Sequence, residues 1–265
     1  MQIRDILRNN VKEKLARGEV VASMTVRLTR SVEIARIAKT AGFDSLYVDL
    51  EHSSMSIDTC GQICVAAMEA GIAPFVRVPA NTPDYIARVL ENGALGIIAP
   101  HVRSAAEAKA VVQAAKFAPL GERSNATGLP HLHYRSFPAA EAYAALNDAT
   151  MVIVQFESAA ALDHADEIIG VDGIDLVLIG LNDMLADWGL PGQYDHPRVR
   201  EAYRKTIDAC RRHNKHCGVG GLSSRPDLMA EYVKMGARYV STGTDLGFLL
   251  GACAQKAKQV HEIKL

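Results

Sequence analysis

The feature that most constrains the fold is a set of eight short, nearly uninterrupted apolar segments separated by longer segments with helical periodicity. These apolar segments cover residues 20–26, 45–51, 74–79, 96–102, 151–157, 175–180, 217–221 and 238–243. Apolar residues run through them continuously instead of alternating with polar ones, which is typical of parallel strands covered on both faces. The pattern therefore predicts an α/β protein with a parallel sheet.

The intervening segments carry helix signals. Residues 31–41 and 104–116 each place apolar side chains at intervals of three and four positions,. The segment 197–214 begins with Pro197 and ends in positive charge, as helices prefer,. Glycines follow several of the helical stripes, where a left-handed residue often ends a helix: Gly42, Gly71, Gly93 and Gly236,.

Eight strand–helix repeats in a chain of 265 residues predict one (β/α)₈ TIM barrel over residues 1–265,. The alternative is an open, doubly wound sheet. That fold usually has a glycine-rich turn after its first strand, and the segment "VRLTRSVE" at 26–33 contains no glycine,. The segment 118–149 fits the repeat least well, and the atypical loop within it, 121–137, is expected to be either functional or disordered, with no role assigned to it.

Composition excludes several classes of protein. The chain has 29 basic and 30 acidic residues and no basic block, so we expect neither a nucleic-acid partner nor an anionic membrane partner,. The N-terminal "MQIRDILRNN" lacks the apolar centre of a signal peptide, and no apolar run approaches the roughly 18–20 residues of a membrane span,. The five cysteines are scattered, and we expect buried thiols in a reducing cytoplasm,. Cys60 and Cys64 lie one helical turn apart, but no second pair accompanies them as a metal site would require,.

Polar residues gather at the ends of the predicted strands, and chemistry in a barrel takes place at the carboxyl ends of the strands. These residues are Asp49, Glu51 and His52 after the second strand, Arg77 in the third, Gln155 and Glu157 in the fifth, and Asn182 and Asp183 after the sixth. Two carboxylates on neighbouring strands would converge at the barrel mouth. Hard cations such as Mg²⁺ or Mn²⁺ prefer such oxygen ligands.

Structural readings of the same residues stay open. Asp183 could cap the helix expected at 184–188. Arg77 could be a structural ion-pair partner, and His52 could be a buried core histidine. A lysine at the end of a strand, which a Schiff-base aldolase requires, is absent from the sequence, so a metal-assisted mechanism is favoured over a covalent imine,.

From about residue 10 to 255 the sequence resembles the HpcH/HpaI aldolases, the class II metal-dependent pyruvate aldolases. The motifs that carry the resemblance are "DLEH" (49–52), "VRVP" (76–79), "GIIAPHVRSAAEA" (96–108), "PLGER" (119–123), "QFES" (155–158) and "IGLNDM" (179–184). The resemblance implies cleavage of 4-hydroxy-2-oxo acids to pyruvate and an aldehyde through a metal-stabilised pyruvate enolate. It also implies a divalent metal (Mg²⁺, Mn²⁺ or Co²⁺) and a homo-oligomer, a hexamer or trimer, that exchanges its last helix, about 246–260.

The resemblance also implies roles for individual residues. Glu157 and Asp183 would bind the metal, Arg77 the pyruvate oxygen, and His52, oriented by Asp49, would be the acid/base; Gln155, Asn182 and Arg123 would contact the substrate or lie near the metal. The sequence departs from the family at "GERSNATG" (121–128), where a second substrate is expected, so the aldehyde stays open. The alternatives are a citrate-lyase β-type enzyme acting on acyl-CoA, or another metal-dependent lyase or decarboxylase of 2-oxo acids. A non-catalytic barrel is disfavoured because His52, Arg77, Glu157 and Asp183 are all present.

Overall fold

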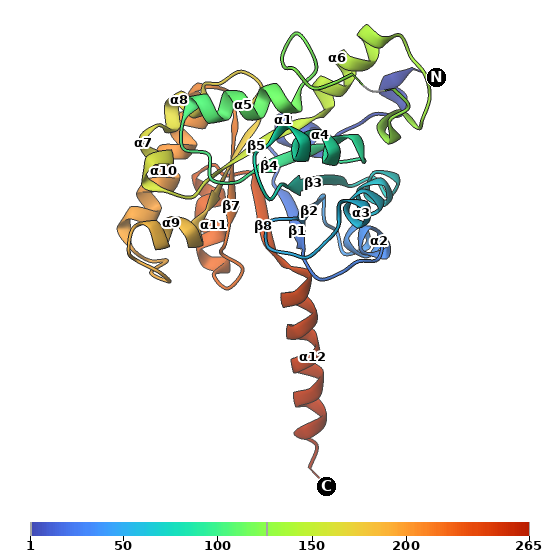
Figure 1. Ribbon diagram of the computed structural model, residues 1–265. Coiled ribbons are helices and arrows are strands. Elements are labelled where there is room, and N and C mark those ends of the chain that lie inside the picture. Colours follow the sequence, from blue (N-terminus) through green and yellow to red (C-terminus); the bar gives the residue numbers. More distant parts are fainter. Residues whose placement is uncertain (1, 126, 265) are drawn as a thin grey trace.

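The protein is a closed barrel of parallel strands in which each strand pairs with the next in the sequence and β8 pairs with β1 (Figure 1). This computed structural model describes residues 2–125 and 127–264. Its strands are β1 (Val21–Val26), β2 (Ser45–Asp49), β3 (Ala73–Arg77), β4 (Gly96–Ala99), β5 (Met151–Phe156), β6 (Leu176–Gly180), β7 (His216–Gly220) and β8 (Tyr239–Thr244). The predicted TIM barrel is confirmed, and the open-sheet alternative is wrong.

Helices surround the barrel and cover one of its ends. They are η1 (Ile3–Asp5), α1 (Asn10–Ala16), α2 (Glu33–Thr40), α3 (Ile57–Glu69), α4 (Pro83–Glu91), α5 (Ala105–Ala115), η2 (Pro130–Leu132), α6 (Ala139–Ala149), α7 (Ala159–Asp163), α8 (Ala165–Ile169), α9 (Leu181–Asp187), α10 (Pro197–Arg212), α11 (Pro226–Met235) and α12 (Asp245–His261). The three helices expected at 31–41, 104–116 and 197–214 are present as α2, α5 and α10. The glycines expected to end helices all have positive φ angles.

Side chains along each strand alternate between the barrel interior and the helix layer, because successive residues of a strand point to opposite faces. Tyr47 and Phe75 belong to the core inside the barrel, whereas Val48 and Val76 pack in the core under the helices. Two positions beyond Tyr47 and Phe75, the same inward rows reach Asp49 and Arg77. A polar layer therefore closes the apolar interior at the carboxyl ends of the strands.

The opposite, N-terminal end of the barrel is covered by η1, α1, η2 and α6. The Asn9 side chain donates to the carbonyl oxygens of Leu95 and Ala149, at 3.4 and 2.8 Å, and so fastens the start of the chain to the beginnings of β4 and β5. The segment 118–149, which fitted the repeat least well, contains η2 and α6 and lies at this end. Residue 126, inside the atypical loop, is outside the described residues.

The last helix, α12, does not pack along the barrel. It leaves the carboxyl end of β8 and projects away from the barrel (Figure 1). Asp245 at its start is buried, but the residues from Leu246 to Lys264 are exposed, including the apolar Leu249 and Leu250. None of the described helices is both long and apolar enough to span a membrane.

Candidate active site

A cavity of about 410 Å³ opens at the carboxyl ends of the strands. Its lining includes Arg27, His52, Arg77, Glu157, Asn182 and Asp183. A cavity of similar size, about 390 Å³, lies at the N-terminal end, where segments such as Asp5–Arg8 and Pro130–His131 line it. Only the first cavity gathers the residues expected at the strand ends, so we take it as the candidate site.

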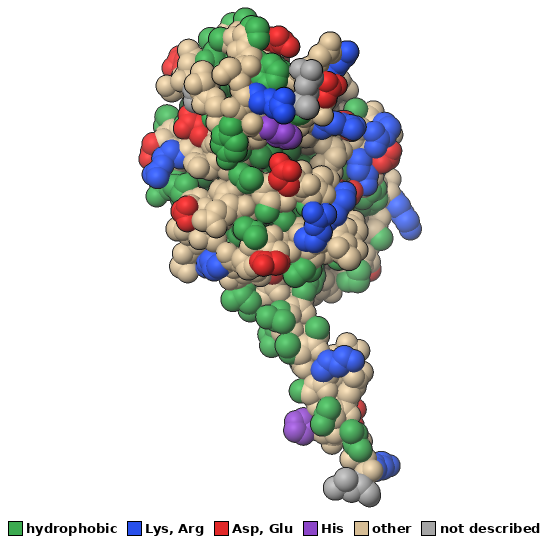
Figure 2. All heavy atoms as spheres, turned by 90° about the vertical axis from the view of Figure 1, so that its right-hand side faces the viewer, with side chains coloured by type: hydrophobic (Ala, Val, Ile, Leu, Met, Phe, Trp, Pro, Cys, Tyr) green, Lys and Arg blue, Asp and Glu red, His purple; other side chains and the backbone are tan. Residues whose placement is uncertain are grey.

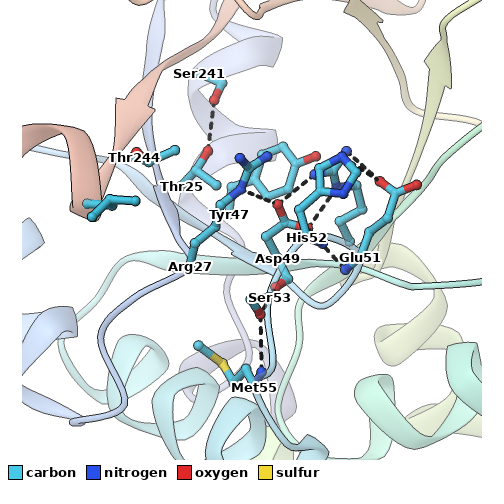
Figure 3. A network of polar contacts seen from close by, with 12 residues as sticks. Thr25, Arg27, Tyr47, Asp49, Glu51, His52, Ser53, Met55, Ser241 and Thr244 are labelled. Atoms are coloured by element: carbon cyan, nitrogen blue, oxygen red, sulfur yellow. Dashed lines mark hydrogen bonds and ion pairs between the residues drawn. The ribbon is translucent and has the colours of Figure 1, made fainter. Parts of the chain in front are cut away.

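Two arginines bind the buried carboxylate of Asp49, and Figure 3 shows the contact with Arg27. Arg77 donates from Nε to Oδ1 at 2.9 Å and from Nη2 to Oδ2 at 2.6 Å, and Arg27 donates from Nε to Oδ2 at 2.6 Å. Burial alone would raise the pKa of Asp49, but the hydrogen bonds and charges of the two arginines outweigh it and hold this pKa below its usual value,. Asp49 is therefore ionised and fixes the planes of both guanidinium groups.

The position of Arg27 depends on the start of α12. The carboxylate of Asp245 accepts hydrogen bonds from the backbone N–H groups of Arg27, Leu28 and Thr29, at 2.7–3.1 Å. These contacts fix the turn that follows β1. They place a second cationic side chain at the cavity, next to Arg77.

Glu157 is the most constrained carboxylate of the cavity. Its Oε1 accepts from Gln155 Nε2 at 3.0 Å, and its Oε2 accepts from the backbone N–H of His101 at 2.8 Å. Burial raises the pKa of Glu157; hydrogen bonding to His101 opposes the shift, and the negative charges of Asp183 and Glu51 add to it,. The negative charge of Glu157 is therefore not fully balanced by the hydrogen bonds and positive charges around it.

Gly180 allows Glu157 to lie close to β6. A Cβ atom at position 180 would come within 2.7 Å of both Cγ and Oε1 of Glu157. The same glycine is the N-cap residue of α9, and no side chain caps this helix. Asp183 lies in the first turn, with an exposed side chain. Capping of the next helix therefore does not explain Asp183, and its carboxylate faces the cavity that Glu157 lines.

His52 lies at the rim of the cavity, but its imidazole is not held by Asp49. The Oδ1 atom of Asp49 accepts from the backbone N–H groups of Glu51 and His52, at 3.1 and 3.2 Å, and so shapes the turn after β2. The acidic group beside the imidazole is Glu51, whose Oε2 lies 3.7 Å from His52 Nε2 (Figure 3). The expectation that Asp49 orients His52 holds for the backbone and not for the ring.

Gln155 and Asn182 join the same cavity. Gln155 is oriented by Tyr47, whose hydroxyl donates to Gln155 Oε1 at 3.3 Å. The hydroxyl of Tyr194 donates to Asn182 Oδ1 at 2.9 Å. Eight of the nine residues singled out in the sequence, all but Arg123, thus lie in this cavity or in direct contact with its lining.

Arg123 lies elsewhere. It follows α5 and packs with its guanidinium carbon 4.5 Å from the ring centre of Phe117, which belongs to the core at the N-terminal end of the barrel. Burial lowers the pKa of Arg123 to about 10. Within the part of the chain that the structure describes, its Nε and Nη2 have no hydrogen-bond partner. The structure therefore does not bring Arg123 to the cavity of its own chain, and its expected contact with substrate is not supported there.

The residues present fit a divalent cation. Among residues 2–125 and 127–264, no three His, Cys, Asp or Glu side chains converge as a complete metal site. Two carboxylates are nevertheless enough for Mg²⁺, which usually keeps several waters and takes further oxygens from its substrate. Burial and, to a smaller extent, the charge of Asp183 raise the pKa of Glu157, and a bound cation would offset both effects,.

Two residues of the site escaped the sequence reading. Arg27 is the first residue after β1, so the rule that chemistry follows the strands would have found it. His101 lay inside a strand expected to run to 102, whereas β4 ends at Ala99 and His101 occupies a turn with a φ of 55°. What the sequence analysis lacked was the point at which β4 ends and the turn with His101 begins.

Comparison with known proteins matches this picture. The family model described as HpcH/HpaI aldolase/citrate lyase matches residues 26–252. The chain is 35% identical over 97% of its length to a 4-hydroxy-4-methyl-2-oxoglutarate aldolase of Hapsidospora irregularis, covering 96% of that protein. It is 34% identical over 91% of its length to the 2-keto-3-deoxy-L-rhamnonate aldolase of Escherichia coli K12, covering 88% of that protein.

A solved structure extends the likeness to three dimensions. The crystal structure of an HpcH/HpaI aldolase from Desulfitobacterium hafniense superposes with a TM-score of 0.90 at 30% identity, with 96% of this chain and 97% of that one covered. Both the aldolases and the citrate lyases of the family description are carbon–carbon lyases, which confirms the predicted class of enzyme. The chain belongs to the HpcH/HpaI aldolase/citrate lyase family.

Proposed function

We propose that the protein is a divalent-metal-dependent aldolase that cleaves 4-hydroxy-2-oxo acids to pyruvate and an aldehyde or ketone. The observation that carries this proposal is that Glu157, Asp183, Arg77 and His52 line one cavity at the carboxyl end of the barrel. The first named relative acts on a 4-hydroxy-2-oxo acid and the second on a 2-keto acid, which supports the same substrate class here.

Glu157 and Asp183 are the residues that would hold the metal, Mg²⁺, Mn²⁺ or Co²⁺. When bound, such an ion acts as a Lewis acid that polarises the keto group of the substrate. The hydrogen bonds from Gln155 and His101 keep the Glu157 carboxylate in one orientation. Oε1 retains a lone pair beyond the one that Gln155 uses, whereas Oε2 also lies 2.9 Å from His101 Nδ1.

Arg77 stabilises the charge that develops during cleavage. As the bond between C3 and C4 breaks, its electron pair moves toward the keto oxygen, and pyruvate leaves as its enolate. Asp49 fixes the guanidinium plane of Arg77 through two hydrogen bonds, so that its remaining N–H groups can point into the cavity,. A donor fixed in advance need not reorganise when the charge appears.

His52 is the residue that accepts the proton of the substrate's 4-hydroxyl group. Its imidazole accepts the proton of the 4-hydroxyl, and the oxygen left behind becomes the carbonyl oxygen of the released aldehyde or ketone. A proton added at C3 converts the enolate to pyruvate and balances the reaction. A histidine is suited to this step because its ordinary pKa lies near neutrality.

The test is direct. The purified protein with Mn²⁺ is incubated with a 4-hydroxy-2-oxo acid, and the pyruvate formed is measured with lactate dehydrogenase. We expect pyruvate and the carbonyl product in equal amounts. A protein that releases no pyruvate from a panel of such acids, but cleaves an acyl-CoA substrate, would show the citrate-lyase type of activity and overturn the proposal.

We also propose that the protein is a homo-oligomer, a trimer or hexamer, in which α12 packs against a neighbouring copy. Leu249 and Leu250 on the projecting helix are 55% and 66% exposed, and hydrophobic side chains gather where the helix joins the barrel (Figure 2). Leu28 and Ile37, on the β1 turn and on α2, are exposed as well. A second copy of the chain would bury both sets, which supports exchange of α12 between subunits.

A cytoplasmic location completes the proposal. All five cysteines are free thiols, and four of them are buried. Free thiols are typical of proteins in a reducing compartment. Recovery of the native protein in the cytoplasmic fraction of its own cells would test this.

A further inference from the structure

The side of the cavity formed by β1, β7 and β8 takes no part in the proposed steps. Apart from Arg27, the residues that line it there are glycines, serines and threonines, among them Thr25, Gly220, Ser223, Ser224, Ser241 and Thr244. The hydroxyl oxygens of Thr25 and Ser241 lie 3.1 Å apart. The residues proposed to act on the pyruvate part of the substrate lie on or just after β3, β5 and β6. This polar side therefore faces the rest of the substrate.

Arg27 occupies the inward position that follows Thr25 on β1. Met24 and Val26 pack in the core under the helices, so the alternation of the strand turns Thr25 and Arg27 toward the cavity,. The Nε atom of Arg27 donates to Asp49 Oδ2 at 2.6 Å. Within residues 2–125 and 127–264, its Nη1 and Nη2 make neither a hydrogen bond nor an ion pair. The end of the guanidinium group is therefore unpaired at the cavity.

Arg77, the other arginine of the cavity, is engaged on all three of its side-chain nitrogen atoms. Asp49 binds Nε and Nη2, and Nη1 lies 2.6 Å from Glu51 Oε2. Glu51 is held in turn by His101, whose Nε2 lies 3.0 Å from Glu51 Oε1. The side chain of Arg77 is 4% exposed, whereas that of Arg27 is 36% exposed. Of the two arginines that bind Asp49, Arg27 is the one that can accept a further anion through a free edge.

The surroundings of Arg27 suit a carboxylate better than a phosphate group. A phosphate in a barrel commonly takes backbone N–H groups from the start of a helix near the last two strands. At the start of α12 these groups are already used: Leu246 donates to Asp245 Oδ1 at 2.9 Å, and Gly247 donates to Thr244 Oγ1 at 3.0 Å. The buried carboxylate of Asp245 would also repel a doubly charged group. One guanidinium edge with two parallel N–H groups matches one carboxylate.

We propose that Arg27 binds a second carboxylate of the substrate, carried on C4, so that the protein cleaves 4-hydroxy-2-oxo dicarboxylic acids. The inference rests on the proposed function and names its substrate class. Arg77 on β3, His52 after β2 and Arg27 after β1 follow one another around the barrel. The keto oxygen, the 4-hydroxyl and the C4 substituent follow one another along the substrate in the same order. The C4 carboxylate takes no part in the bond changes and leaves on the carbonyl product, which is then a 2-oxo acid.

Two pairs of matched compounds test the inference. 2-Oxoglutarate has a carboxylate on C4 where 2-oxopentanoate has a methyl group, and neither has the 4-hydroxyl that cleavage requires. Isothermal titration calorimetry of the Mn²⁺-loaded protein gives the Kd of each. We expect 2-oxoglutarate to bind roughly tenfold or more tightly, because hydrogen bonds to a charged group have that effect. The cleavable pair, 4-hydroxy-2-oxoglutarate and 4-hydroxy-2-oxopentanoate, differs in the same way, and its kcat/KM values should show the same preference.

Substitutions of Arg27 assign the preference to this residue. Arg27→Gln should weaken 2-oxoglutarate binding by roughly 10–100-fold and leave 2-oxopentanoate binding nearly unchanged. Arg27→Lys keeps the charge without the two-pronged geometry, so its loss should be intermediate. Arg36→Gln makes the same change at an exposed position of α2 and is the control. A general loss of structure would lower the affinity for both analogues together, so the ratio of the two Kd values reports on recognition. The melting temperature shows which variants fold, and Arg27→Lys carries the comparison where Arg27→Gln does not.

A preference for the dicarboxylate that is lost in Arg27→Gln, reduced in Arg27→Lys and kept in Arg36→Gln would support the inference. Equal affinity of the unmodified protein for the two analogues, or an unchanged preference in a folded Arg27 variant, would overturn it. More efficient cleavage of a 4-hydroxy-2-oxo acid that ends in a phosphate would overturn it too. Failure of the proposed function would look different, because neither 4-hydroxy acid would then release pyruvate.

Discussion

Asp49 and Arg77 are register partners at the last paired position of β2 and β3, and their side chains meet in a two-pronged ion pair. The planar guanidinium group matches the two oxygens of the carboxylate, which is the strongest geometry available to such a pair. Asp49 is fully buried and Arg77 is 4% exposed. The pair therefore sets both the stability of this end of the barrel and the direction of Arg77 toward the cavity.

Asp49→Asn should destabilise the protein strongly. Removing one partner of a buried ion pair leaves the other charge uncompensated, at a cost of about 3–5 kcal/mol in the free energy of unfolding. Denaturant unfolding of the mutant beside Asp172→Asn, a substitution of an exposed aspartate, checks this. A loss no larger than that of the control would mean that the pair adds nothing to stability.

The same pair predicts a pH dependence. The pKa of Asp49 in the folded protein lies below its ordinary value of 3.8, so the folded state binds this proton less tightly than the unfolded chain does. The contribution of the pair is therefore fully present above about pH 4 and is lost as the pH falls through the folded pKa. The stability difference between the unmodified protein and Asp49→Asn should be constant at pH 5–8 and shrink in stronger acid.

Arg77 should be tested with lysine as well as alanine. Arg77→Ala should lower kcat by roughly 10²–10³-fold, the usual effect of removing a donor from a developing oxyanion. It also leaves Asp49 buried beside only Arg27, so its loss of activity includes a loss of stability. Arg77→Lys keeps the charge without the two-pronged geometry. An unchanged kcat in a folded alanine variant would remove Arg77 from the reaction.

Metal removal should abolish turnover. Excess EDTA should stop pyruvate release, and added Mn²⁺ should restore it. Glu157→Gln should weaken Mn²⁺ binding by about tenfold or more, since loss of even an outer partner of a metal site costs 10–100-fold. Electron paramagnetic resonance of free Mn²⁺ measures this without relying on activity. Glu167→Gln, at an exposed helix position, is the control and should bind Mn²⁺ as the unmodified protein does. Full activity in excess EDTA would contradict the metal mechanism.

The strands and their order could be predicted from the sequence because the barrel buries both faces of every strand. Continuous apolar runs such as 151–157 record that burial directly. Glu157 stood out because it interrupts such a run at its carboxyl end. The position of Glu157, a proposed metal ligand, follows from the periodicity of the strands, since a strand end fixes where its last inward side chain must lie.

The surroundings of His52, the proposed acid/base residue, depend on turns, whose conformation hydrophobic periodicity does not predict. The contact of His101 with Glu51 requires a left-handed residue two positions after β4, and the sequence carries no glycine there to signal it. The resemblance to the family implied that Asp49 orients His52. In the structure Arg77 and Arg27 bind that carboxylate first. Arg123 was misplaced because its motif lies in the long segment at the N-terminal end of the barrel.

The projecting helix makes a prediction about assembly. Leu250→Glu places a charge on the exposed apolar surface of α12, where the proposed partner would bury it,. We expect the mass measured by size-exclusion chromatography with light scattering to fall toward that of the 28.6 kDa monomer. Gln255→Glu adds the same charge at an exposed polar position of the helix and should leave the mass unchanged. A monomeric unmodified protein would contradict the proposed exchange.

The final prediction concerns His52. If its imidazole accepts the proton of the 4-hydroxyl, His52→Ala should slow aldol cleavage by roughly 10²–10⁴-fold, the usual contribution of a positioned acid/base group. Oxaloacetate decarboxylation requires stabilisation of the enolate but no removal of a hydroxyl proton, so it should suffer much less in the same mutant.

A purely structural role for His52 makes the opposite prediction. If the ring only packs against its neighbours, both rates should fall together, and the melting temperature should fall with them. The 49% exposure of this side chain argues for a small loss of stability, because a half-exposed ring fills little of the core,. Measuring the two rates and the melting temperature on one preparation of His52→Ala separates the roles. Equal losses in both reactions would count against His52 as the group that takes the hydroxyl proton.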